Sequence, residues 1–338
     1  MHFMLVNPSS WLLRGLRAIV GAACAAVLAA GAHAAGLTVL LADDNVAHAE
    51  FVRLLRESQD ASSRFELVRL PADGTPADRG GAGGEDRVNA GVRTRSLRPN
   101  PPVDLPVTMA VGVAAARSAI ERPGQDPLVL AMLSRLDYES LKDNPALKRG
   151  DRQVGVLLRE PAMTDQLALI DAVLPHKRRL GVVATAESEP IVRELQRAAQ
   201  GWDLQIEYAP DARSLASVLR TLVPRSDALM VLPDLIGDSQ PATLSVLRAG
   251  ATAGLPVFGT SDGLVRSGGL AAAVSTPGQL AQQARALGRK LAMGPVAGGL
   301  LVEAATPSTV RVNATVARGL GLRLPDEREL TERVTTTR

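Results

Sequence analysis

The stretch LGVVATAESEPIVRELQRAAQGWDLQIEY, residues 180–208, carries one full repeat of the pattern that decides the fold. Residues 180–183 form a short apolar run, as in a strand that is buried on both faces. Apolar side chains then recur from 191 to 199 at the spacing of one helix face, and Gly201 follows as a stop signal. The alternating run 204–208 predicts another strand. The stretch therefore predicts a strand, a helix and a parallel strand.

The same alternation of apolar runs and helical patterns extends in both directions. The expected strands are 37–41, 65–68, 107–111, 127–132, 154–158, 180–183, 204–208, 228–232, 257–258 and 270–274. Helical patterns separate most of them, and a capping box with proline at the first helical position opens a helix at Thr276. Strands that alternate with helices of this length predict an α/β protein with parallel sheets and helices on both faces.

The N-terminus has the layout of a secretory signal peptide. Arg14 and Arg17 precede the apolar run 18–30, and the small residues of 32–34 form a cleavage site. The run is shorter than the roughly 20 residues that span a bilayer, so we favour cleavage after residue 34 over an uncleaved anchor. We expect a periplasmic protein. Its mature part lacks cysteine, because Cys24 is the only one, and can form no disulfide or thiolate metal site.

Residues 71–104 interrupt the pattern. They are rich in glycine, proline, arginine and aspartate and contain few apolar residues. Such a segment buries too little apolar surface to offset its ordering entropy, so we predict a mobile insertion. Its GGAGG run does not match a phosphate-binding loop, because no strand precedes it and no helix follows it.

Composition argues against several classes of function. The formal net charge is +3, and aromatic residues make up 2% of the chain, so neither a basic field nor stacking rings indicate nucleic-acid binding. No dinucleotide fingerprint or Walker A loop is present, and no cluster of ligands indicates a metal. We therefore expect no cofactor and no metal.

Residues 259–263, GTSDG, match the G-x-S-x-G pattern of serine hydrolases. A hydrolase of that kind needs a histidine after the serine, but the mature chain holds only His48 and His176, both before Ser261. The glycines of 259–269 also predict a loop rather than an immediate helix. We therefore expect no enzyme and disfavour an exported serine hydrolase.

Ligands of open parallel sheets bind beyond the carboxyl ends of the strands. The residues that follow the expected strands are the candidate ligand-binding residues. They are Asp43, Asp44, Asn45, Gly112, Ser134, Thr185, Glu187, Asp234, Ser261 and Asp262. Each aspartate could equally well only cap a helix. His48, one turn past Asp44, is interpreted as a histidine at the core boundary.

Residues 154–183, VGVLLREPAMTDQLALIDAVLPHKRRLGVV, resemble ABC transporter substrate-binding proteins of the tryptophan/tyrosine kind. The likeness continues through GLPVFGTSDGLVRSGGLAAAVSTPGQLAQQA and VRVNATVARGLGLRLPDE and covers about residues 107–330. It implies the type 1 periplasmic binding protein architecture, in which two Rossmann-like lobes enclose a ligand and three segments cross between them.

The resemblance implies a division of the chain. Lobe one would comprise 36–150 and 276–294, and lobe two 151–275 and 295–323, with the strand 310–312 closing its sheet. Residues 324–338 would form a surface helix and tail.

The resemblance also implies a function. The leading hypothesis is a monomeric periplasmic protein that delivers a small molecule to an ABC permease. The alternative is a periplasmic sensor or accessory component with the same fold. The aromatic side chains that would sandwich an aromatic amino acid are missing, which favours a small polar, zwitterionic ligand.

Overall fold

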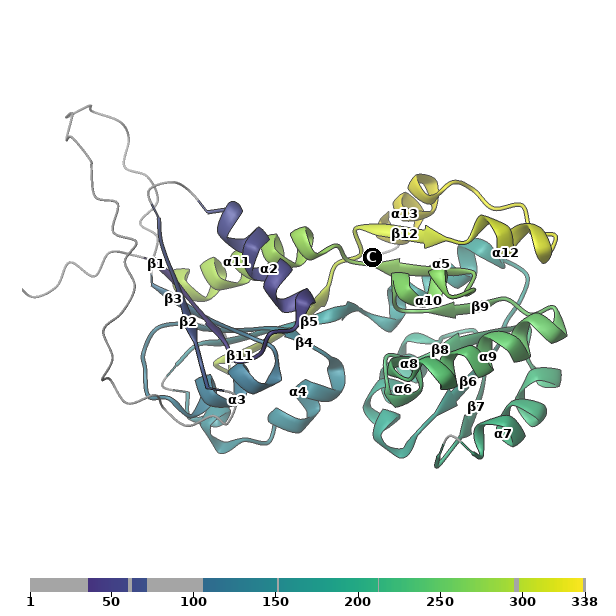
Figure 1. The fold of residues 1–338 in the computed structure, drawn as a ribbon, viewed down its shortest axis with the longest axis horizontal. Helices are drawn as coiled ribbons and strands as arrows, with labels where there is room; N and C mark the ends of the chain where they lie inside the picture. Colours follow the sequence, from purple (N-terminus) through teal and green to yellow (C-terminus); the bar gives the residue numbers. More distant parts are fainter. Residues whose placement is uncertain are drawn as a thin grey trace, which may run out of the picture.

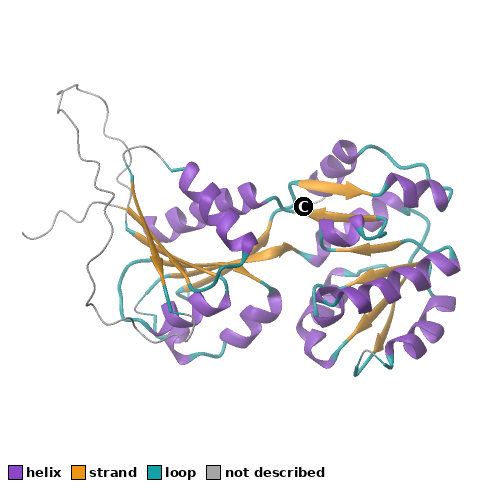
Figure 2. Cartoon of the chain, in the orientation of Figure 1, coloured by secondary structure: helices purple, strands orange, loops and turns teal. Residues whose placement is uncertain are grey.

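The computed structural model describes residues 36–59, 63–71, 106–150, 152–211, 213–294 and 298–336. The expected signal peptide, 1–34, and nearly all of the expected insertion, 72–104, lie outside the described residues. Figure 1 shows two lobes side by side along the long axis of the molecule, joined by segments at its centre. Each lobe is a sheet with helices on both faces (Figure 2).

Lobe one is built on a six-stranded parallel sheet. Its strands are β1 (Gly36–Leu41), β2 (Arg64–Arg69), β3 (Val107–Val111), β4 (Leu128–Leu133), β5 (Val154–Pro161) and β11 (Leu300–Ala305). Its helices are α2 (Val46–Glu57), α3 (Val113–Glu121), α4 (Arg135–Leu141), the 3-10 turn η2 (Pro145–Lys148) and α11 (Pro277–Met293). The strand order is β11-β5-β4-β3-β1-β2.

Lobe two repeats this plan with one antiparallel edge strand. Its strands are β6 (Arg179–Ala184), β7 (Asp203–Tyr208), β8 (Ala228–Val231), β9 (Val257–Gly259), β10 (Ala271–Val274) and β12 (Thr309–Val312), in the order β12-β10-β9-β8-β6-β7. Its helices are α5 (Met163–Val173), η3 (Ala186–Ser188), α6 (Glu189–Ala198), α7 (Leu215–Leu222), η4 (Val223–Arg225), α8 (Leu235–Asp238), α9 (Gln240–Ala253), α10 (Asp262–Arg266), α12 (Ala314–Gly319) and α13 (Glu327–Thr336). The pairing of β12 with β10 confirms the strand predicted at 310–312.

Each sheet separates two apolar cores because successive strand residues face opposite sides. In β1, Val39 packs in the core under α2 and α11, whereas Leu40 packs in the core under α3. Lobe two has the same arrangement, with one core beneath α5, α6 and α13 and another beneath α7 and α9. Strands covered on both faces carry almost no polar side chains, which is why their apolar runs could be predicted.

The lobe boundaries differ from the prediction in two places. β5 and β11 pair with each other and with β4, so both belong to the sheet of lobe one, although residues 151–275 and 295–323 were expected in lobe two. The apolar run of β5 indicates a strand but carries no signal for the sheet it joins. The C-terminal helix α13 is also more than a surface helix, because Leu330 and Val334 are buried in the core of lobe two.

Three segments cross between the lobes. The chain passes from β5 to α5, returns from β10 to α11, and passes again from β11 to β12. The second and third crossings are tied together: Ser275 Oγ donates to the Thr306 carbonyl at 2.5 Å, and the Thr276 N–H donates to Ser308 Oγ at 2.9 Å. These bonds make the two crossings one connected strap.

Asp227 joins the start of β8 to the start of β6. Its carboxylate accepts hydrogen bonds from the Arg179 guanidinium at 3.0 Å and from the Arg179 N–H at 3.1 Å. These bonds, above all that of the guanidinium, hold the pKa of the Asp227 carboxyl well below its usual value.

Asp227→Asn is expected to lower the free energy of unfolding at pH 7 by about 1 kcal/mol, since Arg179 is half exposed and water screens the pair. A carboxyl with a lowered folded pKa stabilises the native state above its unfolded pKa of about 4 and loses that effect as the pH falls. Urea unfolding should therefore show a difference between wild type and variant that shrinks between pH 7 and pH 3. Asp143→Asn, at a carboxylate that is 80% exposed, is the control. A constant Asp227→Asn difference across this range would contradict the prediction.

Candidate functional site

The carboxyl edges of the two sheets lie toward the junction of the lobes. β5 runs parallel to the other strands of sheet one, and its carboxyl end leads directly into lobe two. β10 runs parallel to β9, and its carboxyl end leads back into lobe one. The carboxyl ends of both sheets are therefore where the chain crosses. The ten candidate residues follow strand ends on these edges.

Each sheet has a topological switch point on its carboxyl edge. In sheet one the order changes direction between β1 and β3, and in sheet two between β6 and β8. Loops on either side of such a point diverge and leave a crevice, which is where open α/β sheets bind ligands. The residues after β1, β3, β6 and β8 are therefore the strongest candidates for ligand contacts.

Asp43, His48 and Gly112 come together at the switch point of lobe one. His48 Nδ1 lies 2.8 Å from Asp43 Oδ1 and 3.1 Å from Oδ2. Gly112, at φ 81° and ψ 165°, brings its backbone against the imidazole, where a Cβ would lie 2.6 Å from His48 Cε1. The interpretation of His48 as a plain boundary histidine missed this contact. An aspartate five residues before the histidine, across a helix N-terminus, was the available signal.

The other candidates in lobe one have identifiable structural roles. Asn45 caps α2 by accepting from the Ala47 N–H at 2.8 Å, and Asp44 pairs with Arg69 at 2.7 Å. Ser134 caps α4 in a capping box with Asp137. These contacts use some of the polar atoms of each side chain.

At the switch point of lobe two, both carboxylate oxygens of Asp234 accept hydrogen bonds. Asp234 has an exposed fraction of 0% and caps α8 by accepting from the N–H groups of Ile236 and Gly237. Its other oxygen accepts a short hydrogen bond from Ser188 Oγ. Burial raises the pKa of the Asp234 carboxyl, and these hydrogen bonds oppose the shift. Thr185 donates its N–H to Ser188 Oγ at 3.0 Å, while Glu187 is exposed.

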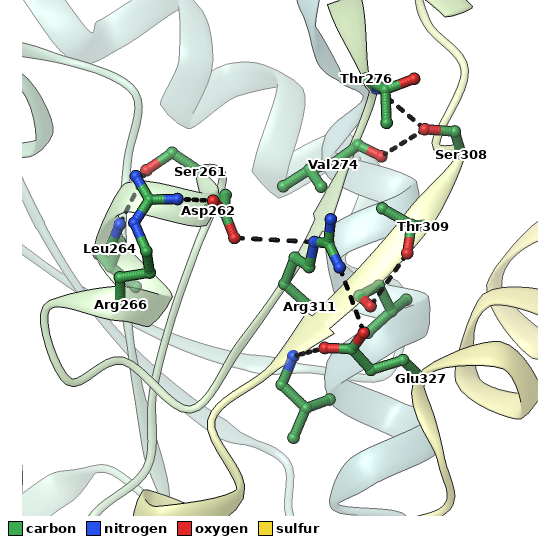
Figure 3. A network of polar contacts seen from close by, with 12 residues as sticks. Ser261, Asp262, Leu264, Arg266, Val274, Thr276, Ser308, Thr309, Arg311 and Glu327 are labelled. Atoms are coloured by element: carbon green, nitrogen blue, oxygen red, sulfur yellow. Dashed lines mark hydrogen bonds and ion pairs between the residues drawn. The ribbon is translucent and has the colours of Figure 1, made fainter.

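Ser261 and Asp262 belong to a charged network beyond β9 (Figure 3). Ser261 Oγ accepts from the Leu264 N–H at 3.2 Å and so caps α10. Asp262 pairs with Arg266 and lies 3.7 Å from Arg311, which also contacts Glu327. The loop predicted after Ser261 was wrong, since α10 begins at Asp262. Four residues separate Gly263 from Gly268, which leaves room for one helical turn capped by Ser261.

Neither histidine of the described residues is hydrogen-bonded to Ser261. His48 is held by Asp43 in lobe one, and His176 is exposed between α5 and β6. The Ser261 hydroxyl accepts instead from the backbone of its own helix.

A charged pair on the first crossing is a further candidate that sequence analysis missed. Arg159 Nε donates to Glu160 Oε1 at 2.6 Å, whereas Glu160 Oε2 is buried without a hydrogen-bond partner among the described residues. Burial raises the pKa of the Glu160 carboxyl, against the effect of Arg159. Two charges at the end of the apolar run VGVLLREP were the signal for this pair.

One ion pair joins the lobes directly. Arg135, at the start of α4, lies 2.6 Å from Glu194 of α6, and Glu194 also accepts from the Met163 N–H at 3.1 Å. A groove of about 700 Å³ runs beside this pair between the two helices. It is lined by Arg135, Glu139, Lys142, Pro190, Arg193, Gln196 and Arg197. The ion pair between Arg135 and Glu194 therefore helps to set the relative position of the lobes.

The described ranges show neither a metal site nor a membrane-spanning helix. They contain no group of three or more histidine, cysteine, aspartate and glutamate side chains that could hold a metal ion. The helices within them include none that combines the length and apolar character needed to cross a membrane.

Comparisons with known proteins point in one direction. Residues 108–333 match the family model described as ABC transporter substrate binding protein. No curated protein sequence matches the chain.

Several solved structures share the fold. A ligand-free, open substrate-binding protein with adhesive properties from Clostridium difficile has 15% identity and a TM-score of 0.60, over 86% of this chain and 96% of that one. An ABC domain in complex with L-Trp from Streptococcus pneumonia has 16% identity and a TM-score of 0.52, over 88% and 98%. A conserved domain protein from Vibrio cholerae has 17% identity and a TM-score of 0.52, over 89% and 98%.

Proposed function

The chain belongs to the ABC transporter substrate-binding protein family, and on that basis we propose that it binds a small polar molecule between its lobes and delivers it to an ABC permease. The observation that carries the proposal is the crossing of the chain at the carboxyl edges of both sheets, which brings two switch points to the junction of the lobes. Closure of such lobes around a ligand is the hinge motion of binding proteins of this architecture.

The proposed site comprises the ten residues at the strand ends. These are Asp43, Asp44, Asn45, Gly112, Ser134, Thr185, Glu187, Asp234, Ser261 and Asp262. Their contacts support unequal roles: Asp234 holds its own lobe together, whereas Asp43 keeps 38% of its side chain exposed. The polar character of the set supports a polar ligand, and the tryptophan/tyrosine specificity stays a prediction.

The proposal includes where and how the protein works. We place it in the periplasm as a monomer after cleavage behind residue 34, with a permease as partner and without catalysis. The N-terminal sequence supports export. The capping contact of Ser261, which has no histidine partner among the described residues, supports a binding protein rather than a hydrolase.

Lobe closure provides the direct test. Because the cleaved protein retains no cysteine, Gln125→Cys in lobe one and Ala216→Cys in lobe two, both exposed, give two specific sites for fluorescent labels. Small molecules that co-purify with the protein from its own cells would be identified by mass spectrometry and added back. We expect a ligand-dependent change in energy transfer that saturates with micromolar affinity, typical of about −8 kcal/mol of binding free energy. The proposal is wrong if no small molecule co-purifies and none of the cell's metabolites changes the transfer.

A further inference from the structure

The switch points of the two lobes hold their acids in different ways. Asp234 in lobe two is buried, and both of its oxygens accept hydrogen bonds from its own lobe. Asp43 in lobe one is partly exposed; its oxygens face the imidazole of His48, and Oδ1 also accepts from the Asn45 N–H at 3.1 Å. Both acids accept from the backbone of their own lobe, but Asp43 also holds the ring of His48.

The imidazole of His48 is held on two sides. Its side chain is 10% exposed, Nδ1 faces the Asp43 carboxylate, and the ring edge rests against the backbone of Gly112. Nε2 has no hydrogen-bond partner among the described residues. No lysine or arginine of the described residues is paired with Asp43, which contacts His48 instead. Nε2 is therefore the ring nitrogen of His48 that is left for a ligand.

The partner of Nδ1 sets what Nε2 can do. An ionised carboxylate only accepts hydrogen bonds, so the nitrogen that faces it carries the hydrogen. A neutral imidazole that donates from Nδ1 has a bare lone pair on Nε2. Such a ring accepts a hydrogen bond from whatever enters the crevice.

We propose that His48, oriented by Asp43, is a further ligand-contacting group of lobe one, and that it selects ligands that present an O–H or N–H donor to Nε2. The inference rests on the proposed function, because it assumes a ligand between the lobes. It names the ligand class by chemistry: an amine or a polyhydroxylated molecule, rather than a molecule that offers only carboxylates or apolar surface.

The state of the ring can be measured without any ligand. Two-bond ¹H–¹⁵N spectra of the labelled protein distinguish the two tautomers and the imidazolium, and His48→Gln assigns the signal. At a pH at which the ring is neutral, we expect His48 to carry its hydrogen on Nδ1, and the exposed His176 provides the reference signal. A hydrogen on Nε2 of His48 would overturn the proposal.

The ligand class is tested with matched probes. One half of the panel contains the L-amino acids whose side chains carry no hydrogen-bond donor and neutral monosaccharides, and the other half contains their N-trimethylated and fully O-methylated counterparts, which lack the donors. Thermal shift and calorimetry should find binding only in the first half, and the amino-acid and sugar arms separate amines from hydroxyls. Equal binding of a donor-free counterpart would overturn the proposal.

Variants of His48 separate contact from packing. For the probe that binds, His48→Ala should weaken affinity by about tenfold or more, the loss expected for one buried hydrogen bond to a ligand. His48→Gln places an amide oxygen near the position of Nε2 and should bind within about threefold of wild type. His176→Ala should leave affinity unchanged. Wild-type affinity in His48→Ala would refute the contact. If neither half of the panel binds wild type, the ligand class proposed here is wrong, whereas the proposed function is judged on the co-purified molecules.

Discussion

Asp234→Ala is expected to lower the free energy of unfolding by about 3 kcal/mol, a large stability effect among the candidate residues. The substitution removes the cap of α8, because the Ile236 and Gly237 N–H groups lose their acceptor, a loss of about 1 kcal/mol. It also takes this acceptor from the buried Ser188 hydroxyl, at about 1–3 kcal/mol. Together the two losses amount to about 3 kcal/mol.

The pH dependence of this effect has a definite sign. Burial raises the folded pKa of Asp234, so the native state favours its protonated form. The carboxyl contributes fully below its unfolded pKa of about 4, and less as the pH rises through the higher folded value. Urea unfolding should therefore show a larger difference between wild type and Asp234→Ala at pH 4 than at pH 7.

Two variants control this experiment. Asp238→Ala removes an exposed carboxylate at the other end of the same helix and should change the free energy by less than about 0.5 kcal/mol. Ser188→Ala removes the hydroxyl partner, so its effect and that of Asp234→Ala should not add in the double variant. Additive effects, or an Asp234→Ala protein as stable as wild type, would show that the contact is weak.

The architecture could be predicted from sequence because parallel strands covered on both faces consist of apolar residues. Nothing but the hydrophobic pattern was needed for the strand at 154–158. Its sheet could not be predicted, since a buried strand has the same pattern in either lobe. Membership in sheet one is decided by hydrogen bonds to β4 and β11, between residues far apart in sequence.

The candidate residues could be grouped from the sequence, but their individual contacts could not be predicted. Strand ends of a parallel sheet share one edge, so residues after strands could be grouped from topology alone. An aspartate after a strand can cap a helix or meet a ligand, and the two cases have the same sequence pattern. Only the contacts separate Asp234, which is saturated by its own lobe, from Asp43, which orients His48. The contact between Arg159 and Glu160 could not be predicted either, because the run VGVLLREP that contains them indicates only a buried strand.

Gly112→Ala is expected to abolish the proposed ligand contact and to lower the free energy of unfolding by about 3 kcal/mol. Its backbone, at φ 81° and ψ 165°, lies in a region that is almost exclusive to glycine, and strain there amounts to about 1–3 kcal/mol. The added Cβ would stand 2.6 Å from His48 Cε1, 3.0 Å from His48 Nδ1 and 3.3 Å from Asp43 Oδ2. The ring must therefore move away from the carboxylate that orients it, and a bound probe should lose at least about tenfold in affinity.

Strain and collision can be separated by two further variants. Gly201 also has a φ of 81°, but a Cβ there would meet nothing within 4 Å, so Gly201→Ala is the reference for a positive-φ glycine without a collision, with about 1 kcal/mol expected. In a His48→Ala background the collision is gone, and the stability loss of Gly112→Ala should fall toward the Gly201→Ala value. Chemical unfolding of the four proteins closes the cycle. If Gly112→Ala has the same effect with and without His48, the glycine is required by its backbone alone. The close approach of Gly112 to the imidazole would then have no part in holding His48 at the switch point.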